Sequence, residues 1–175
     1  MELDLKELAE KIHENAKAKG FYDNASDANF VTHQTFEIIK EIGEMHEAYK
    51  KGRFAAELNL KETIESFEAD IKDTFEDEMA DVVIRMLDYM RYNEFEIAQP
   101  TIFPPGEVLI DGHYWLSREC FRMINALYDI EEFYFMDIIS HIYTIAHLFN
   151  VDLDKHIQAK MAYNATRERL HGKKF

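Results

Sequence analysis

Residues 75–92 read FEDEMADVVIRMLDYMRY, and this stretch indicates the fold of the chain. Its apolar residues recur at steps of three and four positions, which predicts a helix with one buried stripe. The stripe consists of Phe75, Met79, Val82, Met86 and Tyr89. Glu78 and Asp81 lie beside the stripe rather than opposite it, and their spacing of three makes them neighbours on one helix face. This helix therefore carries two carboxylates at the rim of a core.

The same periodicity continues on both sides and predicts helices along most of the 175 residues. The chain has six glycines and three prolines, and all three prolines lie between positions 100 and 105, so little else interrupts a helix. The segment 93–113, which contains them, is predicted to be an ordered loop. The predicted helices cover residues 3–18, 29–51, 68–92, 114–129, 131–149 and 152–169. We therefore expect an all-α helical bundle that forms one domain over residues 1–175.

Composition excludes several classes of partner. The chain has 34 acidic residues against 20 Lys and Arg, a formal net charge of −14, which argues against a nucleic-acid polymer or an anionic membrane surface. No run approaches the roughly 20 apolar residues of a membrane span, and the acidic start lacks an apolar signal core. Cys120 is the single cysteine, so no intramolecular disulfide is possible. We expect a cytoplasmic protein.

A second acidic doublet, Glu41 and Glu44, lies at the edge of the apolar stripe of the helix predicted over 29–51. One such doublet is most often a solvated helix face, but two on successive helices, both at core edges, favour a site. Four converging carboxylates repel one another unless a cation lies among them. Hard oxygen ligands without interleaved Cys or His favour Mg²⁺, with Mn²⁺ as the alternative.

These doublets resemble the ExxE and ExxD helices of the MazG-like all-α nucleoside triphosphate pyrophosphohydrolases. Both ends of the chain are similar to the same family. Ile12-His13-Glu14-Asn15-Ala16, followed by Lys19-Gly20-Phe21, resembles its opening helix. Lys160-Met-Ala-Tyr-Asn164-Ala-Thr-Arg167, followed by His171-Gly172-Lys173-Lys174-Phe175, resembles its closing one. The resemblance covers residues 5–92 and 150–175.

The resemblance implies Mg²⁺-dependent hydrolysis of a nucleoside triphosphate to the monophosphate and pyrophosphate, as in housecleaning of the nucleotide pool. It implies that Glu41, Glu44, Glu78 and Asp81 hold the metal, and that Glu41 or Glu44 acts on the attacking water. Lys160, Asn164 and Arg167 share one face of the last helix and would bind phosphates or sugar, although a basic face that solvates an acidic protein has the same pattern. His13 and Asn15 are further substrate-binding candidates, but two residues apart on a helix they point in different directions.

The chain departs from the simplest relatives by an insertion at about 93–149, which predicts a MazG-like four-helix core plus an inserted helical hairpin. Phe135-Met-Asp-Ile-Ile139 can be aligned loosely with Met79-Ala-Asp-Val-Val83, with Tyr134 in the place of Glu78. One hypothesis is that the hairpin replaces the partner subunit that relatives recruit by dimerising. The alternative is an unrelated hairpin that enlarges the core. A homodimer is a possible assembly, and the sequence leaves the oligomeric state open.

Two other functions compete with this interpretation. A ferritin-like di-iron protein needs Glu-x-x-His pairs, and Glu10/His13 and Glu168/His171 have that spacing at the two chain ends. A non-catalytic nucleotide-binding or interaction module would keep the fold without turnover, with the aromatic-rich insertion as a partner surface. The base, the sugar and the choice between triphosphate, diphosphate and a specialised substrate such as dUTP stay open.

Overall fold

The computed structural model describes residues 3–55, 64–104, 114–128 and 132–172. These residues form α-helices and one short 3-10 helix, and no strand occurs among them. The all-α class predicted from the sequence is therefore confirmed. The elements are α1 (Leu5–Ala18), α2 (Phe30–Lys50), α3 (Ile64–Asp70), α4 (Phe75–Tyr92), α5 (Trp115–Leu127), α6 (Glu132–Leu148), α7 (Leu153–Thr166) and the 3-10 helix Arg169–Gly172.

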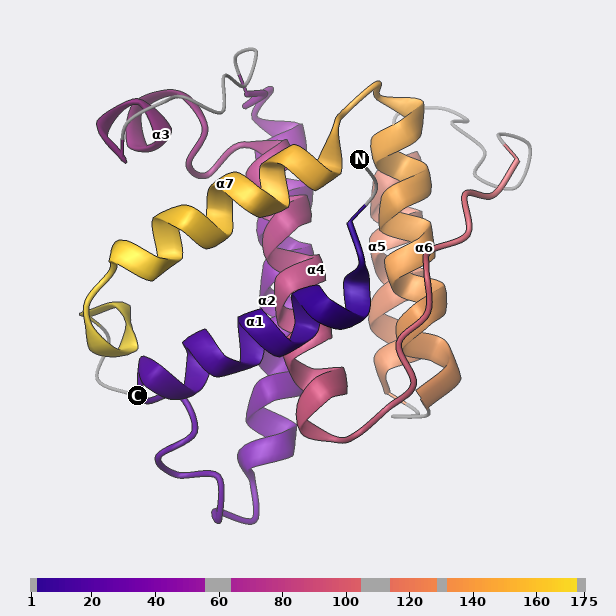
Figure 1. Cartoon of the computed structure of the whole chain (residues 1–175). Coiled ribbons are helices and arrows are strands. Elements are labelled where there is room, and N and C mark those ends of the chain that lie inside the picture. Colours follow the sequence, from indigo (N-terminus) through magenta and orange to yellow (C-terminus); the bar gives the residue numbers. More distant parts are fainter. Residues whose placement is uncertain (1–2, 56–63, 105–113, 129–131, 173–175) are drawn as a thin grey trace.

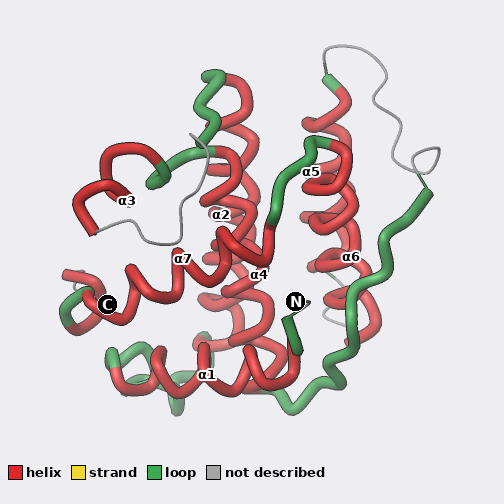
Figure 2. The backbone as a smooth tube through the Cα atoms, turned by 45° about the horizontal axis from the view of Figure 1, so that its top comes forward, coloured by secondary structure: helices red, strands yellow, loops and turns green. Residues whose placement is uncertain are grey.

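Four helices run roughly along one direction, α2 and α6 upward and α4 and α5 downward in Figure 1. Helices α1 and α7 cross in front of the α2–α4 pair, and the turned view keeps this arrangement (Figure 2). Helix α4 packs against α1, α2, α6 and α7. The two chain ends that carry the predicted substrate-binding residues thus lie over the helices that carry the acidic doublets.

Local capping explains where these helices begin. The Asp4 side chain accepts hydrogen bonds from the backbone N–H groups of Lys6 and Glu7, so α1 begins directly after it. Asp152 caps α7 by accepting from the Lys155 N–H, as its sequence position predicts. Gly20 follows α1 with a φ of +82°, a conformation that favours glycine.

The helix predicted over 68–92 is wrong in its first part, because the chain forms two helices there. Asp73, with a φ of +62°, interrupts the helical path between α3 and α4. Thr74 is extended, and its hydroxyl accepts from the Asp77 N–H, so α4 begins at Phe75. The apolar periodicity alone does not reveal this break, since the buried side chains of Phe67 and Ile71 continue the spacing.

The helices predicted over 114–129 and 131–149 are present as α5 and α6, here called the α5–α6 hairpin, and their buried side chains join the core of α1, α2 and α4. Phe135 of α6 stacks on Tyr89 of α4, with ring centroids 4.6 Å apart and an interplanar angle of 6°.

The described part of the predicted loop, 93–104, follows α6 closely. The backbone N–H groups of Thr101 and Phe103 donate to the hydroxyls of Ser140 and Thr144. Residues 105–113 of the same loop lie outside the described residues.

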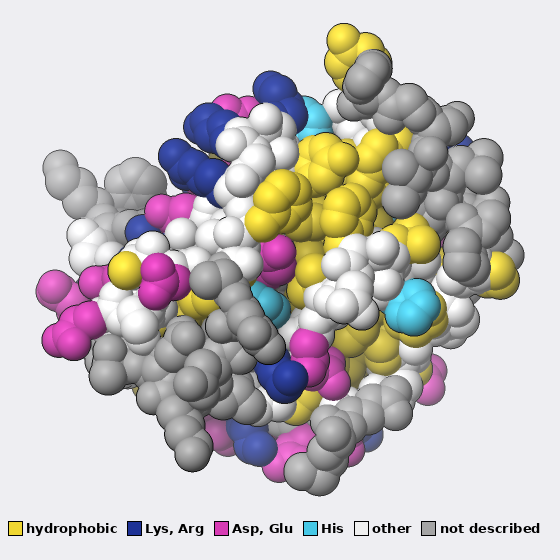
Figure 3. Space-filling model, turned by 90° about the horizontal axis from the view of Figure 1, so that it is seen from above, with side chains coloured by type: hydrophobic (Ala, Val, Ile, Leu, Met, Phe, Trp, Pro, Cys, Tyr) yellow, Lys and Arg dark blue, Asp and Glu magenta, His cyan; other side chains and the backbone are white. Residues whose placement is uncertain are grey.

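An aromatic cluster closes the end of the bundle at which α2 and α6 finish. Trp115 stacks on Phe149 at 5.7 Å, and its indole N–H donates to the Tyr49 hydroxyl at 3.3 Å. Tyr49 also contacts Phe54 and Phe75. Figure 3 views the molecule from this end and shows hydrophobic side chains gathered together, with charged side chains around them.

The aromatic residues in and beside α5 and α6 divide between core and surface. Trp115 and Phe135 are buried, whereas Tyr114 and Phe121 are 81% and 69% exposed. Within the described parts of the chain, no helix is both long enough and apolar enough to cross a membrane.

If the hairpin is part of one cooperative core, Phe135→Ala will lower the free energy of unfolding by about 3–5 kcal/mol, because it removes a fully buried ring that packs on α4. Phe121→Ala makes the same chemical change at an exposed position of α5 and should shift stability by less than about 0.5 kcal/mol. Urea unfolding followed by circular dichroism measures both. Equal, small effects would show that α6 contributes little to the core.

Candidate metal and anion site

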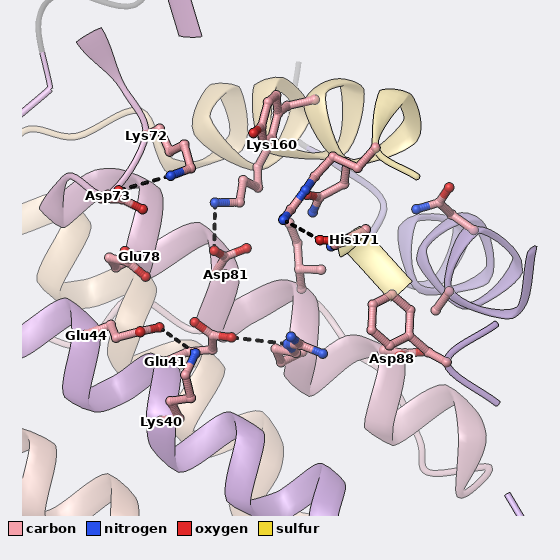
Figure 4. Close-up of a pocket in the computed structure, with 18 residues that line it drawn as sticks. Lys40, Glu41, Glu44, Lys72, Asp73, Glu78, Asp81, Asp88, Lys160 and His171 are labelled. Atoms are coloured by element: carbon pink, nitrogen blue, oxygen red, sulfur yellow. Dashed lines mark hydrogen bonds and ion pairs between the residues drawn. The ribbon is translucent and has the colours of Figure 1, made fainter. Parts of the chain in front are cut away.

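Three of the four predicted metal ligands converge in the structure. Carboxylate oxygens of Glu41, Glu44 and Glu78 lie within 4.8 Å of one another, so a single cation could contact all three. Asp81, one turn after Glu78 on α4, lines the same cavity, and Figure 4 shows the four carboxylates around a common space. Each doublet supplies neighbouring acids because its two residues are one helical turn apart. The packing of α2 on α4 then brings the doublets together.

The acids form one part of a cavity of about 250 Å³. Its remaining wall comes from further residues of α2 and α4, the turn before α4, α1 and the turn after it, α7 and the chain that follows α7. It includes basic, amide and aromatic side chains. The lining residues outside the acidic doublets include Asn15, Phe21, Lys40, Lys72, Arg85, Asp88, Lys160, Tyr163, Asn164, Arg167 and His171. Such a cavity offers oxygen ligands for a cation and nitrogen donors for an anion within one enclosure.

Burial shifts the proton affinities of the acids. It raises the pKa of Glu78 to about 8, and the nearby Asp81 charge adds to this effect. Burial and Asp81 likewise raise the pKa of Glu41 to about 7, although Arg85 opposes them. The surrounding side chains therefore do not fully neutralise the negative charge of these carboxylates. This condition favours a divalent cation among them.

Basic side chains contact three of the four acids. Arg85 Nε lies 3.3 Å from a Glu41 oxygen, and Lys40 Nζ lies 3.0 Å from a Glu44 oxygen. Lys160 Nζ is 2.7 Å from an Asp81 oxygen. Lys160 is buried, which lowers its pKa, but the two carboxylates that it contacts outweigh this effect and raise the pKa above its ordinary value.

The predicted substrate-binding residues differ in where they lie. Lys160, Asn164 and Arg167 all line the cavity from α7 and its end, and Asn15 lines it from α1. His13 is not among the lining residues. It is buried, and its Nδ1 lies 2.8 Å from an Asp88 oxygen, behind the wall to which Asp88 belongs.

Two residues of this neighbourhood were missed by sequence reasoning. Arg85 lies four residues after Asp81, a spacing that places it on the same helix face, so the helical period could have identified it. Asp77 precedes Glu78 and is only 1% exposed. Its oxygen lies 2.7 Å from Lys160 Nζ, a contact between α4 and α7 that no local sequence pattern reveals.

Neither histidine of the two Glu-x-x-His pairs belongs to the group of acids that could share a cation, although His171 lines the same cavity. Among the described residues, the close group of possible ligands contains three glutamates and no histidine. Glu10 forms an ion pair with Arg91, with 2.6 Å between the charged atoms. This geometry disfavours the ferritin-like di-iron alternative, which requires two such pairs in the bundle core.

Comparison of the chain with models of known protein families, with curated proteins and with solved structures finds no match.

The raised pKa of Glu78 has a consequence for stability. Between pH 4.5 and about 8 the folded protein holds a proton that the unfolded chain has released, so this group's contribution to the free energy of unfolding falls as the pH rises through that range. Glu78→Gln mimics the protonated acid. We expect the variant to be more stable than the wild type at pH 8, by on the order of 1–3 kcal/mol, with the gap closing toward pH 5.

Urea unfolding across this pH range, with a chelator to remove metal ions, measures the difference. Glu47→Gln is the matched control on α2, because Glu47 is exposed and its ion pairs with Lys51 and Lys50 lower its pKa. This control should not gain stability at pH 8. If Glu78→Gln is no more stable than the wild type at pH 8, the charge of Glu78 is already neutralised by its surroundings and the prediction is wrong.

Proposed function

We propose that this protein is a Mg²⁺-dependent nucleoside triphosphate pyrophosphohydrolase of the MazG-like type, which releases a nucleoside monophosphate and pyrophosphate. The observation that carries the proposal is the convergence of Glu41, Glu44 and Glu78, with Asp81 beside them, at one cavity that also presents cationic side chains. The motifs at both chain ends add support, because several of their residues line the same cavity, among them Asn15, Phe21, Lys160, Asn164 and Arg167.

The donor set fits a hard divalent cation. Carboxylate oxygens alone form the close group of possible ligands in the described part of the chain, and Mg²⁺ and Mn²⁺ prefer such ligands. The raised pKa values of Glu41 and Glu78 indicate acids whose charge the neighbouring basic side chains do not fully neutralise. Glu41, Glu44, Glu78 and Asp81 are the residues that would hold the metal.

The rest of the cavity suits a nucleotide. Lys160 and Arg167 would bind phosphate oxygens, and Asn164 would form a hydrogen bond to a phosphate or to the sugar. Phe21 and Tyr163 also line the cavity and would supply aromatic contacts to a base. The net charge of −14 makes a small anion carried with its metal a better partner than a nucleic-acid polymer.

The proposed mechanism assigns a task to each part of the cavity. A bound divalent cation would supply charge neutralisation for the phosphates and a more acidic water. Glu41 or Glu44 orients the attacking water and accepts its proton. Lys160 and Arg167 hold the phosphates in line for attack and stabilise the negative charge on the departing pyrophosphate.

Replacement of a single acid tests this function directly. We expect Glu41→Gln and Asp81→Asn to lower Mg²⁺-dependent pyrophosphate release by about 100-fold or more, because each change removes a charged oxygen ligand from the metal site. The assay follows pyrophosphate from a panel of standard and modified nucleoside triphosphates, with diphosphates included. The panel also identifies the preferred base.

Glu47→Gln, an exposed change on the same helix as Glu41, should leave the rate unaltered. Nucleotide binding without turnover by the wild-type protein would instead support a non-catalytic module of the same fold. Equal rates for the wild type and the two acid variants would refute the metal assignment.

A further inference from the structure

The basic side chains of the cavity contact oxygens of the same carboxylates that would hold a cation. Figure 4 shows Lys160 reaching Asp81 and Lys40 reaching Glu44, and Arg85 contacts Glu41 in the same way. A cation that coordinates these oxygens must displace the nitrogen atoms or share the carboxylates with them. The cavity therefore holds built-in competitors for its own metal ligands.

Lys160 has a second partner that keeps it in place after such a displacement. Its Nζ lies 2.7 Å from Asp77 as well as from Asp81. The same Asp77 oxygen accepts the Asp73 N–H at 3.0 Å, and this fixes the carboxylate at the start of α4. Because Asp77 is buried and lies outside the close group of acids, Lys160 can leave Asp81 without becoming an unpaired buried charge.

Arg85 is arranged in the same way. Besides Glu41, its guanidinium lies 3.6 Å from a Glu37 oxygen and over the ring of Phe21, 5.8 Å from the ring centre. Both contacts can be kept when the Glu41 carboxylate coordinates a metal ion instead of Arg85. Lys40 differs, since its side chain is 40% exposed and water can solvate it when Glu44 is withdrawn. The positively charged side chains of Lys160 and Arg85 thus stay at the cavity wall. Each has a partner other than Glu41, Glu44, Glu78 and Asp81.

We propose that the cavity binds its divalent cation and its phosphate ligand by exchange: the cation takes Asp81 and Glu41 over from Lys160 and Arg85, and these two side chains then bind the phosphates. The proposal rests on the metal site of the proposed function. It makes Asp77 a positioning residue, which holds Lys160 at the cavity while Asp81 changes partner. Coupling between the two ligands is reciprocal, as any such linkage must be.

Exchange makes a prediction that ordinary phosphate binding by Lys160 does not. Lys160→Met removes a competitor for Asp81, so the affinity for Mn²⁺ alone should rise, by about tenfold. The same change removes a phosphate ligand, so the affinity for pyrophosphate at saturating Mg²⁺ should fall, by about tenfold or more. Free Mn²⁺ is counted by electron paramagnetic resonance, and pyrophosphate binding is measured by calorimetry.

Two controls separate charge from position. Lys155→Met lies on the same helix at an exposed lysine that pairs with Asp152, and both affinities should match those of the wild type. Lys160→Arg keeps the positive charge and should restore a Mn²⁺ affinity close to that of the wild type. If Lys160→Met does not fold, Arg85→Met replaces it, with the same opposite changes expected.

The outcomes distinguish this proposal from the one on which it rests. A rise in Mn²⁺ affinity together with a fall in pyrophosphate affinity supports exchange. Unchanged or weaker Mn²⁺ binding by Lys160→Met overturns exchange and leaves the metal site intact. The metal site itself is refuted if the wild type does not bind Mn²⁺, or if the double variant Glu41→Gln/Glu78→Gln still binds it. The exchange proposal then fails as well.

Discussion

The structure depends on how the acids that α4 buries in its first turn are held by other parts of the chain. The N-terminus of a helix favours negative charge, but Glu76, Asp77 and Glu78 are all largely removed from water. The Glu76 carboxylate accepts the Ala55 N–H at 2.7 Å, which holds the segment after α2 against α4. Lys160 reaches Asp77 from α7. Glu76 and Asp77 thereby fix two different neighbours, and Lys160, the partner of Asp77, forms part of the cavity wall.

Much of this helical architecture can be predicted from the sequence, but few of the contacts between residues of different helices can. Apolar residues at steps of three and four positions reveal the long helices within a few residues, and the doublets indicate where carboxylates gather. The break before α4 escapes the same reasoning, because the Thr74 cap lies inside an uninterrupted apolar spacing. Helical periodicity gives the face on which a residue lies, but not which residue of another helix it meets.

Lys160 illustrates this limit. Its place on the last helix marks it as a basic side chain beside Asn164 and Arg167, which would suit a phosphate ligand. Its partnership with Asp77 and Asp81 depends on α7 crossing α4, a packing choice that neither segment encodes alone. His13 illustrates the opposite case, since the crossing of α1 over α4 places it behind Asp88 rather than in the cavity wall. Long-range packing therefore decides which polar residues of the family-like motifs face the cavity.

Trp115, the single tryptophan of the chain, lies where the α5–α6 hairpin meets the helices that carry the acids. Its ring stacks on Phe149, just after α6, and its N–H reaches Tyr49, near the end of α2. Indole emission depends on how well water is excluded from the ring. The chain thus contains an intrinsic fluorescent reporter of whether the hairpin stays docked, one that can be observed without adding a label.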